Sequence, residues 1–460
     1  MKRWTFILFA LALFASQVYP QARPGGIARE IAMGGSNAGT NLVLNPFIMD
    51  DPAILLLNPA YQGLYRDYGW ANIAGGSITG LSGQPAGSPA YGIGDDGYGR
   101  QNAGVGFGIN DQLSLGAVLS YDPSAINALV NSLIIGRISQ RPPQTIPYVG
   151  NVWEVLGSYR LNSSDVIGLG MMYGWSNHDS VNTAADPRRV EGSASVWGIR
   201  GGFVCELATG STLEASAALR LDRTTDDRTT SAGTDGKYST SGTEFQLDAR
   251  AKLNMSAKFN LVPYGSLTMV SAEPKEEARP LGITTATDRS LRINYNAYAL
   301  GIGGEYRTQT LYMAGGVSWR SQRNKLETTI AGATETATAT ATAIPVINVG
   351  AEWWYTDWLA GRIGYYRASE NLNTKEELGA APANNAEGNL TIPNSVISIG
   401  ALGPGSYDGL ITLGVGLKFG GASLDATVSD AALRRGLGLV GSQDAINTFG
   451  YLTASYNFAE

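Results

Sequence analysis

Apolar and polar residues alternate along most of the chain from residue 69 onward, in stretches of about 9 to 11 residues, the length of a tilted strand that crosses a bilayer. One stretch alternates Phe245, Leu247, Ala249, Ala251 and Leu253 with Glu244, Gln246, Asp248, Arg250 and Lys252. A period of two places all apolar side chains on one face of a β-strand. The pattern predicts an all-β protein whose strands turn an apolar face to lipid and a polar face to a lumen.

Short turn sequences alternate with long polar segments between these stretches. The short turns are Asn110-Asp111, Asn162 to Asp165, Thr209-Gly210, Met255 to Lys258, Arg307 to Gln309, Thr356-Asp357 and Gly420-Gly421. The long segments, expected to be outer loops, are 80–102, 122–150, 176–192, 222–242, 271–292, 321–343, 369–409 and 429–447. Tight turns on one side and long loops on the other are typical of an outer-membrane barrel. The tally predicts 14–16 antiparallel strands, because the stretches at 70–79 and 423–429 are weak. A Thr/Ala repeat at 335–343 is expected in an outer loop or a strand extension.

The first 68 residues do not alternate. Residues 1–22 have two basic residues, an apolar core and a small-residue exit, which predicts a secretory signal peptide. Residues 23–68 are predicted to form an N-terminal hatch, or plug, because a wide barrel needs its lumen filled. Residues 69–460 are assigned to one transmembrane β-barrel with short periplasmic turns and long extracellular loops. No apolar run of about 18 residues follows the signal, so no helical span is expected.

Composition agrees with a membrane barrel and gives no sign of a catalytic or metal-binding site. Charged residues are only 16% of the chain, while Gly reaches 59 of 460 and Trp plus Tyr outnumber Phe. The single Cys and single His cannot form a disulfide, a metal cluster or a histidine-based triad. We therefore expect no enzyme, no catalytic residue, no metal and no cofactor. The net charge of −6 gives no reason to expect nucleic acid as a partner.

Two groups of residues are candidates for binding or gating. A ligand-binding platform is suggested in the second predicted loop, where apolar residues recur at helical spacing: Ile126, Leu129, Val130, Leu133, Ile134 and Ile138. The alternative is that this helix packs over the barrel mouth or on the membrane surface. The second group consists of charges on the lumen face: Glu214, Arg220, Glu244, Asp248, Arg250 and Lys252. These charges either hydrate the interior or pair across strands and latch a plug.

The N-terminal segment carries motifs that resemble a known family. Met33-Gly34-Gly35 is followed by Asp50-Asp51-Pro52-Ala53, by Asn58-Pro59-Ala60, and then by a strand and the turn Ile109 to Gln112. This order resembles the FadL family of outer-membrane long-chain fatty acid and hydrophobic compound transporters. The resemblance implies a hatch inside a barrel of fourteen strands, with gating residues at Gly34, Gly35, Asp50, Asp51, Asn58, Pro59 and Ala60. It also extends to Bacteroidetes-type relatives that act as shuttles in protein secretion.

These observations lead to one main hypothesis and two alternatives. The main hypothesis is a barrel in the outer membrane of a Gram-negative cell that mediates passive uptake of hydrophobic small molecules such as long-chain fatty acids. Its partners are then the lipid bilayer and a hydrophobic ligand. One alternative is a shuttle or binding barrel whose partners are secretion-system or cargo proteins. The other is a general porin or a structural barrel.

Overall fold

A computed structural model gives a closed barrel of sixteen strands, each antiparallel to the next, with β1 paired to β16. It describes residues 26–35, 45–49, 51–74, 102–121, 149, 151–182, 188–230, 234–280, 289–330, 333–377, 410–428 and 449–459. The prediction of an antiparallel barrel is confirmed, at the upper end of the expected strand number. Within these residues no helix is long and apolar enough to cross a membrane.

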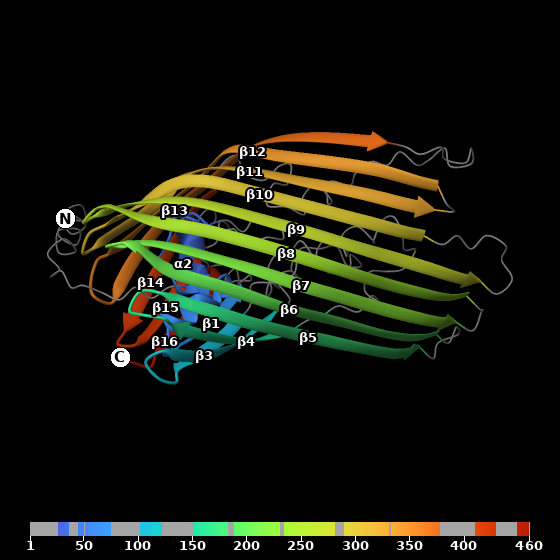
Figure 1. Ribbon diagram of the computed structural model, residues 1–460, viewed down its shortest axis with the longest axis horizontal. Coiled ribbons are helices and arrows are strands. Elements are labelled where there is room, and N and C mark those ends of the chain that lie inside the picture. The colour runs from blue at the N-terminus through green and yellow to red at the C-terminus, as the bar shows by residue number, and fades with distance from the viewer. Residues whose placement is uncertain are drawn as a thin grey trace, which may run out of the picture.

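The strands fall into two sets by length. Nine are tall, with 17 to 23 residues: β5 (Val166–Asn182), β6 (Arg188–Ala208), β7 (Ser211–Thr230), β8 (Thr234–Ser256), β9 (Phe259–Pro280), β10 (Arg289–Arg307), β11 (Leu311–Ile330), β12 (Ala333–Trp354) and β13 (Leu359–Glu377). Seven are short: β1 (Tyr68–Ala74), β2 (Asn102–Gly108), β3 (Leu113–Tyr121), β4 (Asn151–Arg160), β14 (Leu410–Phe419), β15 (Ala422–Val428) and β16 (Phe449–Asn457). Figure 1 shows the tall strands projecting well past the short ones on one side.

The seven predicted tight turns are confirmed, since each lies between two consecutive strands. Local chemistry explains them. The Asn162 side chain accepts hydrogen bonds from the backbone N–H of Ser164 and Asp165 at 2.8 Å, which is the self-bonding that favours Asn in turns. Gly210 and Gly420 adopt φ of 76° and 59°, a region that glycine enters without steric cost. Because successive strands are antiparallel, all seven turns lie at one end of the barrel, the turn end.

Four of the expected long loops are wrong. Strands β5 to β12 continue through most of 176–192, 222–242, 271–292 and 321–343, and the ladder pairs Arg228 with Gly236 and Ile330 with Ala333. The Thr/Ala repeat lies in β12, so of its two expected placements the strand extension is the one observed. Polarity does not by itself mark a loop, because a strand whose backbone is paired on both sides can continue in water while its outward residues are polar.

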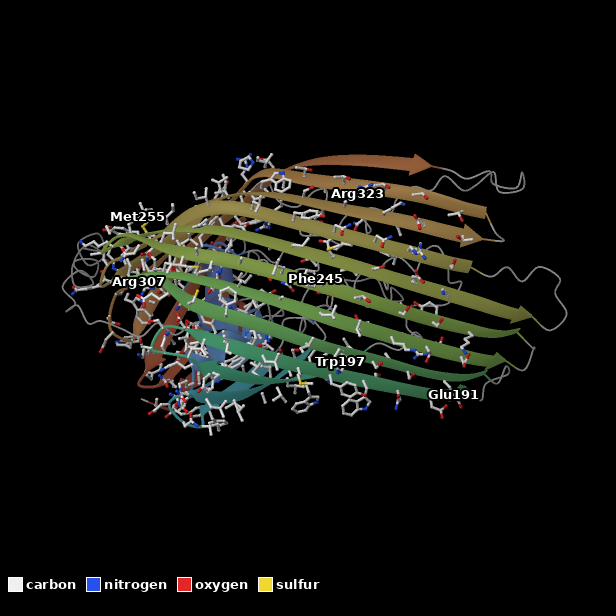
Figure 2. All side chains as sticks on the ribbon, viewed as in Figure 1. Glu191, Trp197, Phe245, Met255, Arg307 and Arg323 are labelled. Atoms are coloured by element: carbon white, nitrogen blue, oxygen red, sulfur yellow. The ribbon has the colours of Figure 1, made fainter. Side chains whose placement is uncertain are left out.

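An apolar band surrounds the barrel at the level shared by tall and short strands. Each strand contributes at least one large, exposed apolar side chain to it: Ile73, Phe107, Leu115, Trp153, Leu169, Trp197, Leu219, Leu247, Met269, Leu300, Val317, Val349, Ile363, Ile411, Leu424 and Tyr456. Figure 2 shows Trp197 and Phe245 on this outer face, with polar Arg323 and Glu191 farther from the turn end. We call this band the belt. An unbroken apolar exterior is typical of a barrel that faces lipid.

The described residues between 26 and 67 lie inside the barrel near the turn end, where Figure 1 shows helix α2 surrounded by strands. The elements are α2 (Ile27–Ala32) and two 3-10 helices, η1 (Pro52–Leu56) and η2 (Pro59–Gly63). Helix α2 contacts β13 to β16, whereas η2 contacts β3 to β6 on the other side. We call residues 26–35, 45–49 and 51–67 the inner segment. It crosses the lumen from one side of the barrel to the other.

Candidate functional site: the inner segment and the lumen wall

The inner segment is tied to the barrel by a buried network of alternating charges. Arg29 in α2 contacts Asp51 at 2.7 Å and Glu352 of β12 at 2.8 Å. Glu352 also contacts Arg362 of β13 at 2.8 Å, and Arg362 contacts Asp425 of β15 at 2.6 Å. All five side chains are at most 1% exposed. Breaking such a buried set at one member is expected to be costly, because it leaves an uncompensated charge.

Burial sets the acidity of the carboxyl groups in the inner segment. It raises the pKa of Asp51 to about 6, although the neighbouring Arg29 guanidinium acts in the opposite direction. Burial also raises the pKa of Glu30, and the nearby Asp51 charge adds to that rise. Glu30 accepts a hydrogen bond from the backbone N–H of Asn45 at 3.1 Å, which joins α2 to the next part of the segment. The segment therefore contains carboxyl groups that titrate closer to neutral pH than ordinary ones.

A second set of contacts between the inner segment and the barrel involves the lumen charges of β7 and β8. Arg250 pairs with Glu214, its register partner across the strands. The Arg250 guanidinium also donates to the backbone carbonyls of Ile48 at 2.8 Å and Pro46 at 3.2 Å, while the Tyr61 hydroxyl donates to Glu214. The same pair thus stabilises the wall and holds two parts of the inner segment.

The Asn58-Pro59-Ala60 motif forms the start of η2. The Asn58 side chain accepts from the backbone N–H of Ala60 at 3.0 Å and donates to the Phe203 carbonyl at 3.2 Å. Asn at this position caps the first turn, and Pro suits the next position because its missing N–H would be unpaired there. Asp51 and Pro52 repeat the arrangement in η1, where Asp51 accepts from the backbone N–H of Ala53 at 2.8 Å. The motif is therefore a cap that is also bonded to the wall.

Glycines of the wall provide the room for the inner segment. A Cβ added to Gly202 would lie 2.1 Å from Asn58 Oδ1, and one added to Gly350 would lie 2.2 Å from the Met33 carbonyl oxygen. Gly34 has φ of 84° and its carbonyl accepts from Asn348 at 2.7 Å. The same close fit recurs at further lumen-facing glycines: Gly106, Gly116, Gly168, Gly316 and Gly364. The high glycine content thus follows in part from close packing of the wall against the segment.

The structure brings together most of the predicted gating residues. Gly34, Gly35, Asp51, Asn58, Pro59 and Ala60 all lie in the inner segment, while Asp50 lies outside the described residues. Their gating role stays a prediction. The suggested platform of Ile126, Leu129, Val130, Leu133, Ile134 and Ile138 also lies outside the described residues.

The six predicted lumen charges occupy different positions relative to the inner segment. Arg220 pairs with Glu244 at 2.6 Å across β7 and β8. Asp248 accepts from the Gln246 side chain at 2.7 Å, and Lys252 lies opposite Thr212 close to the turn end. Glu214 and Arg250 reach the inner segment, at Tyr61 and at the carbonyls of Pro46 and Ile48. Pairing across strands is therefore observed, and the latch hypothesis concerns two residues.

Sequence reasoning missed the central charges of the network. Glu352, Arg362 and Asp425 sit on inward positions of β12, β13 and β15, and Arg29 precedes the motifs. Alternation could have placed the three strand residues on the lumen face, since each follows the period of two. Their pairing could not be read from the chain, because Arg29 and Glu352 are separated by 323 positions.

Above the inner segment, apolar residues occupy much of the inward face of β9 to β12, beside the polar Gln322 and Asn324 of β11. Ile293 of β10 lies opposite Ala272 of β9 and Leu326 of β11, and all three are at most 1% exposed. Val270 and Tyr295 form the neighbouring row. On the outward face of the same strands stand Glu273, Arg292 and Glu327, joined by ion pairs at 2.9 and 3.8 Å. We call residues 270–280, 289–296, 320–330 and 333–343 the extension.

The extension thus inverts the polarity of the belt, since its outside is polar and much of its inside is apolar. Strands β7 and β8 differ, because they keep Asp222, Asp226 and Thr240 on their buried inward faces. The apolar inner surface of β9 to β12 is therefore not continued by these residues of β7 and β8. Such a surface removes an apolar ligand from water and is the kind of wall that hydrophobic binding sites use.

The chain is similar to solved transporter structures at low sequence identity. No family model matches the chain, and no curated protein matches it. The toluene transporter TodX of Pseudomonas putida is 12% identical with a TM-score of 0.41, over 96% of this chain and 100% of that one. The toluene transporter TbuX of Ralstonia pickettii is 10% identical with a TM-score of 0.37, over 95% and 97%. The ferric citrate transporter FecA gives 9% and 0.25, over 77% and 70%. Scores this low do not carry a function, which is therefore argued from the residues of this chain.

Proposed function

We propose that this protein is an outer-membrane barrel through which hydrophobic small molecules, long-chain fatty acids among them, enter passively, with the inner segment as its hatch. The belt supports a place in a bilayer, because one or more apolar side chains from every strand face outward at the same level. The signal peptide expected at residues 1–22 supports export, and the motif resemblance to the FadL family points to the same class of transporter.

The inner segment supports a hatch rather than an open pore. It contacts strands on opposite sides of the lumen, and buried charges hold it at Glu352 and Arg250. A permanent wall element could be held by apolar packing alone. Polar groups that separate can form new hydrogen bonds with water or with other polar partners, so such contacts suit a segment that must move while the barrel remains intact.

The single observation that carries the proposal is the polarity inversion between belt and extension. A lumen built for ions or sugars would keep polar residues on its inward face throughout. Here Ile293, Leu326 and Ala272 form a buried apolar row beyond the belt, where the outward face meets water. That arrangement favours the capture of an apolar molecule from the outside and its delivery towards the hatch.

The test combines conductance with ligand binding. In planar bilayers the wild-type protein is expected to pass almost no steady ion current, whereas a general porin would conduct continuously. Calorimetry with protein in nanodiscs is expected to detect binding of an alkyl ligand such as dodecan-1-ol. Ile293→Asn should weaken that binding about 10-fold, because one buried apolar side chain is worth roughly 1.5–3 kcal/mol.

The matched control lies next to it on the same strand. Asn294→Ala changes the outward face of β10 and should leave binding unchanged, since that side chain is directed away from the lumen. Steady current through the wild type, or equal binding by Ile293→Asn and wild type, would refute the proposal. No binding of any alkyl ligand would refute it as well.

A further inference from the structure

One buried carboxyl group of the inner segment has no cation paired with it. Glu30 of α2 is 3% exposed and makes no ion pair with any residue that the structure describes. It accepts a hydrogen bond from the backbone N–H of Asn45 at 3.1 Å. Asp51 differs, because it is held by Arg29 at 2.7 Å. An ionised carboxylate is costly in a buried place without a cation, and the usual relief is that the group holds a proton.

The guanidinium groups closest to this carboxyl group already contact other carboxylates. Arg29, the preceding residue, lies between Asp51 at 2.7 Å and Glu352 at 2.8 Å. Arg250 of β8 pairs with Glu214 across the strands. Neither arginine can turn to a new partner without leaving a buried carboxylate uncompensated.

The strands that pack against α2 add no spare cation. They are β13 to β16, where Arg362 pairs with Asp425 at 2.6 Å and the groups that contact α2 from β14 and β16 are the neutral hydroxyls of Thr412 and Thr453. Further titratable groups that contact α2 or residues 45–49 carry no positive charge: Tyr264, Tyr312, Tyr451 and Glu305. Three guanidinium groups thus contact four carboxylates already, and ionisation in α2 would add one more negative charge.

Burial and the surrounding charge both favour the neutral form of Glu30. Burial raises its pKa well above 4.5, and the Asp51 charge raises the pKa further, while the Arg29 and Arg250 guanidinium groups lower it by less. The hydrogen bond from Asn45 does not require ionisation, because the carbonyl oxygen of a carboxylic acid also accepts.

We propose that Glu30 is a proton switch of the hatch: it is neutral while the inner segment occupies the lumen, and loss of its proton releases α2 and residues 45–49 from the barrel wall. The inference rests on the proposed function of the inner segment as a hatch and names what regulates it. An ionised Glu30 is stabilised by water, which it reaches only if α2 leaves its buried place.

Glu30 also joins α2 to the stretch that follows it. Asn45, which donates to the Glu30 carboxyl group, uses its side chain to donate to the Met33 carbonyl at 2.7 Å and to accept from the Phe47 backbone N–H at 3.2 Å. The backbone carbonyl of Glu30 accepts from Gly35 at 2.9 Å. Displacement of this one carboxyl group therefore affects both parts of the inner segment.

The direction of the pH dependence follows from the raised pKa. A Glu30 side chain that has moved into water ionises at the ordinary pKa of glutamic acid, whereas the buried one ionises only at higher pH. Between these two values the displaced form becomes more stable as the pH rises, because it alone releases the proton. The inner segment should be held most firmly at acidic pH and loosen as the pH increases.

The experiment measures hydrogen exchange by mass spectrometry with full-length protein in nanodiscs, at pH 5 and at pH 9. The quantity compared is the exchange rate of wild type divided by that of Glu30→Gln at the same pH, over residues 27–35 and 45–49. This ratio removes the intrinsic pH dependence of exchange and the titration of Asp51, which both proteins share. It is expected to be near one at pH 5 and several-fold larger at pH 9, since Gln cannot ionise.

Two further variants test whether the effect belongs to this carboxyl group. Glu327→Gln is the matched control, because it removes a carboxyl group that is 25% exposed on the outer face of the extension, and it should keep the pH dependence of wild type. Glu30→Asp retains a group that can ionise and should also exchange faster at pH 9 than Glu30→Gln.

Infrared spectroscopy gives a second readout that a purely structural role of Glu30 would not produce. The difference spectrum of wild type minus Glu30→Gln is expected to contain the carbonyl stretch of a protonated carboxylic acid at pH 6 and the bands of a carboxylate at pH 9. Carboxylate bands at pH 6 would show that Glu30 is ionised in place and would overturn the proposal.

The outcomes separate this inference from the uptake function, since dodecan-1-ol carries no charge at either pH. If wild type binds dodecan-1-ol but the exchange ratio is the same at pH 5 and pH 9, the proton switch is overturned and uptake stands. The switch is also overturned if Glu30→Gln forms no heat-modifiable barrel or exchanges faster than wild type at pH 5, because Gln mimics the neutral form. Absence of alkyl binding with the expected exchange ratio would overturn uptake and leave Glu30 as a proton-binding group.

Discussion

The two ends of strand β10 have opposite polarity. Near the turn end, Leu300 and Ile302 are 61% and 57% exposed on the outside, while Glu305 is buried inside, where it accepts from the backbone N–H of Met49 at 2.8 Å. Near the other end Arg292 is outside and Ile293 is buried inside. The strand, its pairing and its period of two are the same at both ends. Only what lies on each side differs.

This difference shows that the surroundings of a barrel strand, not its backbone, decide which residues it carries. In the belt, lipid outside requires apolar residues, and the polar inner segment inside requires hydrogen-bonding partners. In the extension, water outside favours charge. The inner face there carries buried apolar residues such as Ile293 and Leu326.

The largest effect is expected from breaking the buried charge network that joins the inner segment to the barrel wall. Glu352→Gln leaves Arg29 and Arg362 without their shared carboxylate, which should cost about 3–5 kcal/mol. The inner segment should loosen, so steady current in planar bilayers and hydrogen exchange at 26–35 should both rise. Glu327→Gln removes a carboxylate from the outer face of the extension, where its side chain is 25% exposed, and should cost under about 1 kcal/mol. If the two variants show the same current and the same hydrogen exchange, carboxylates at the two ends of the barrel do not differ in their contribution to stability.

A smaller effect is expected when a side chain is added to a glycine of the barrel wall that contacts the inner segment. Gly202→Val places a side chain where Asn58 Oδ1 now lies, so the cap of η2 should be lost at a cost of about 1–3 kcal/mol. Faster hydrogen exchange at the backbone of Ala60 and Tyr61 would report it. Gly201→Val is the neighbouring control, since no atom lies within 4 Å of its Cβ position. If both variants exchange like wild type, the inner segment does not depend on this contact.

The smallest effect is a pH dependence of the inner segment. Burial raises the pKa of Asp51 from 3.8 to about 6, so the folded protein binds a proton that the unfolded carboxyl releases. The contribution of Asp51 to stability therefore rises as the pH falls from 7 to 5, by about 1 kcal/mol. Hydrogen exchange at 51–56 should slow over that range in wild type relative to Asp51→Asn, which cannot titrate. If the difference in hydrogen exchange between wild type and Asp51→Asn does not change with pH, the raised pKa of Asp51 is contradicted.

Much of the barrel could be predicted from the chain. Alternation at 244–253 placed Phe245 outside and Glu244 inside, and the seven turns were located from Asn, Asp and Gly. The heights of the strands could not be predicted, because a polar outward face in water has the composition of a loop. The hatch motifs are recognisable by order and spacing, whereas the ion pairs of Arg362 with Glu352 and with Asp425 join three strands and form only through the folded barrel.

The sequence by itself therefore determined the period and the turns, since these depend on neighbours within a few residues, whereas closure of the sheet pairs Tyr68 with Asn457. Tertiary structure alone decided which charges pair, which glycines receive the inner segment and where the lumen becomes apolar. These features join residues hundreds of positions apart, such as Arg29 and Glu352. The free energy of these contacts depends on burial and on the distance between side chains in the folded protein, and neither can be read from the order of residues along the chain.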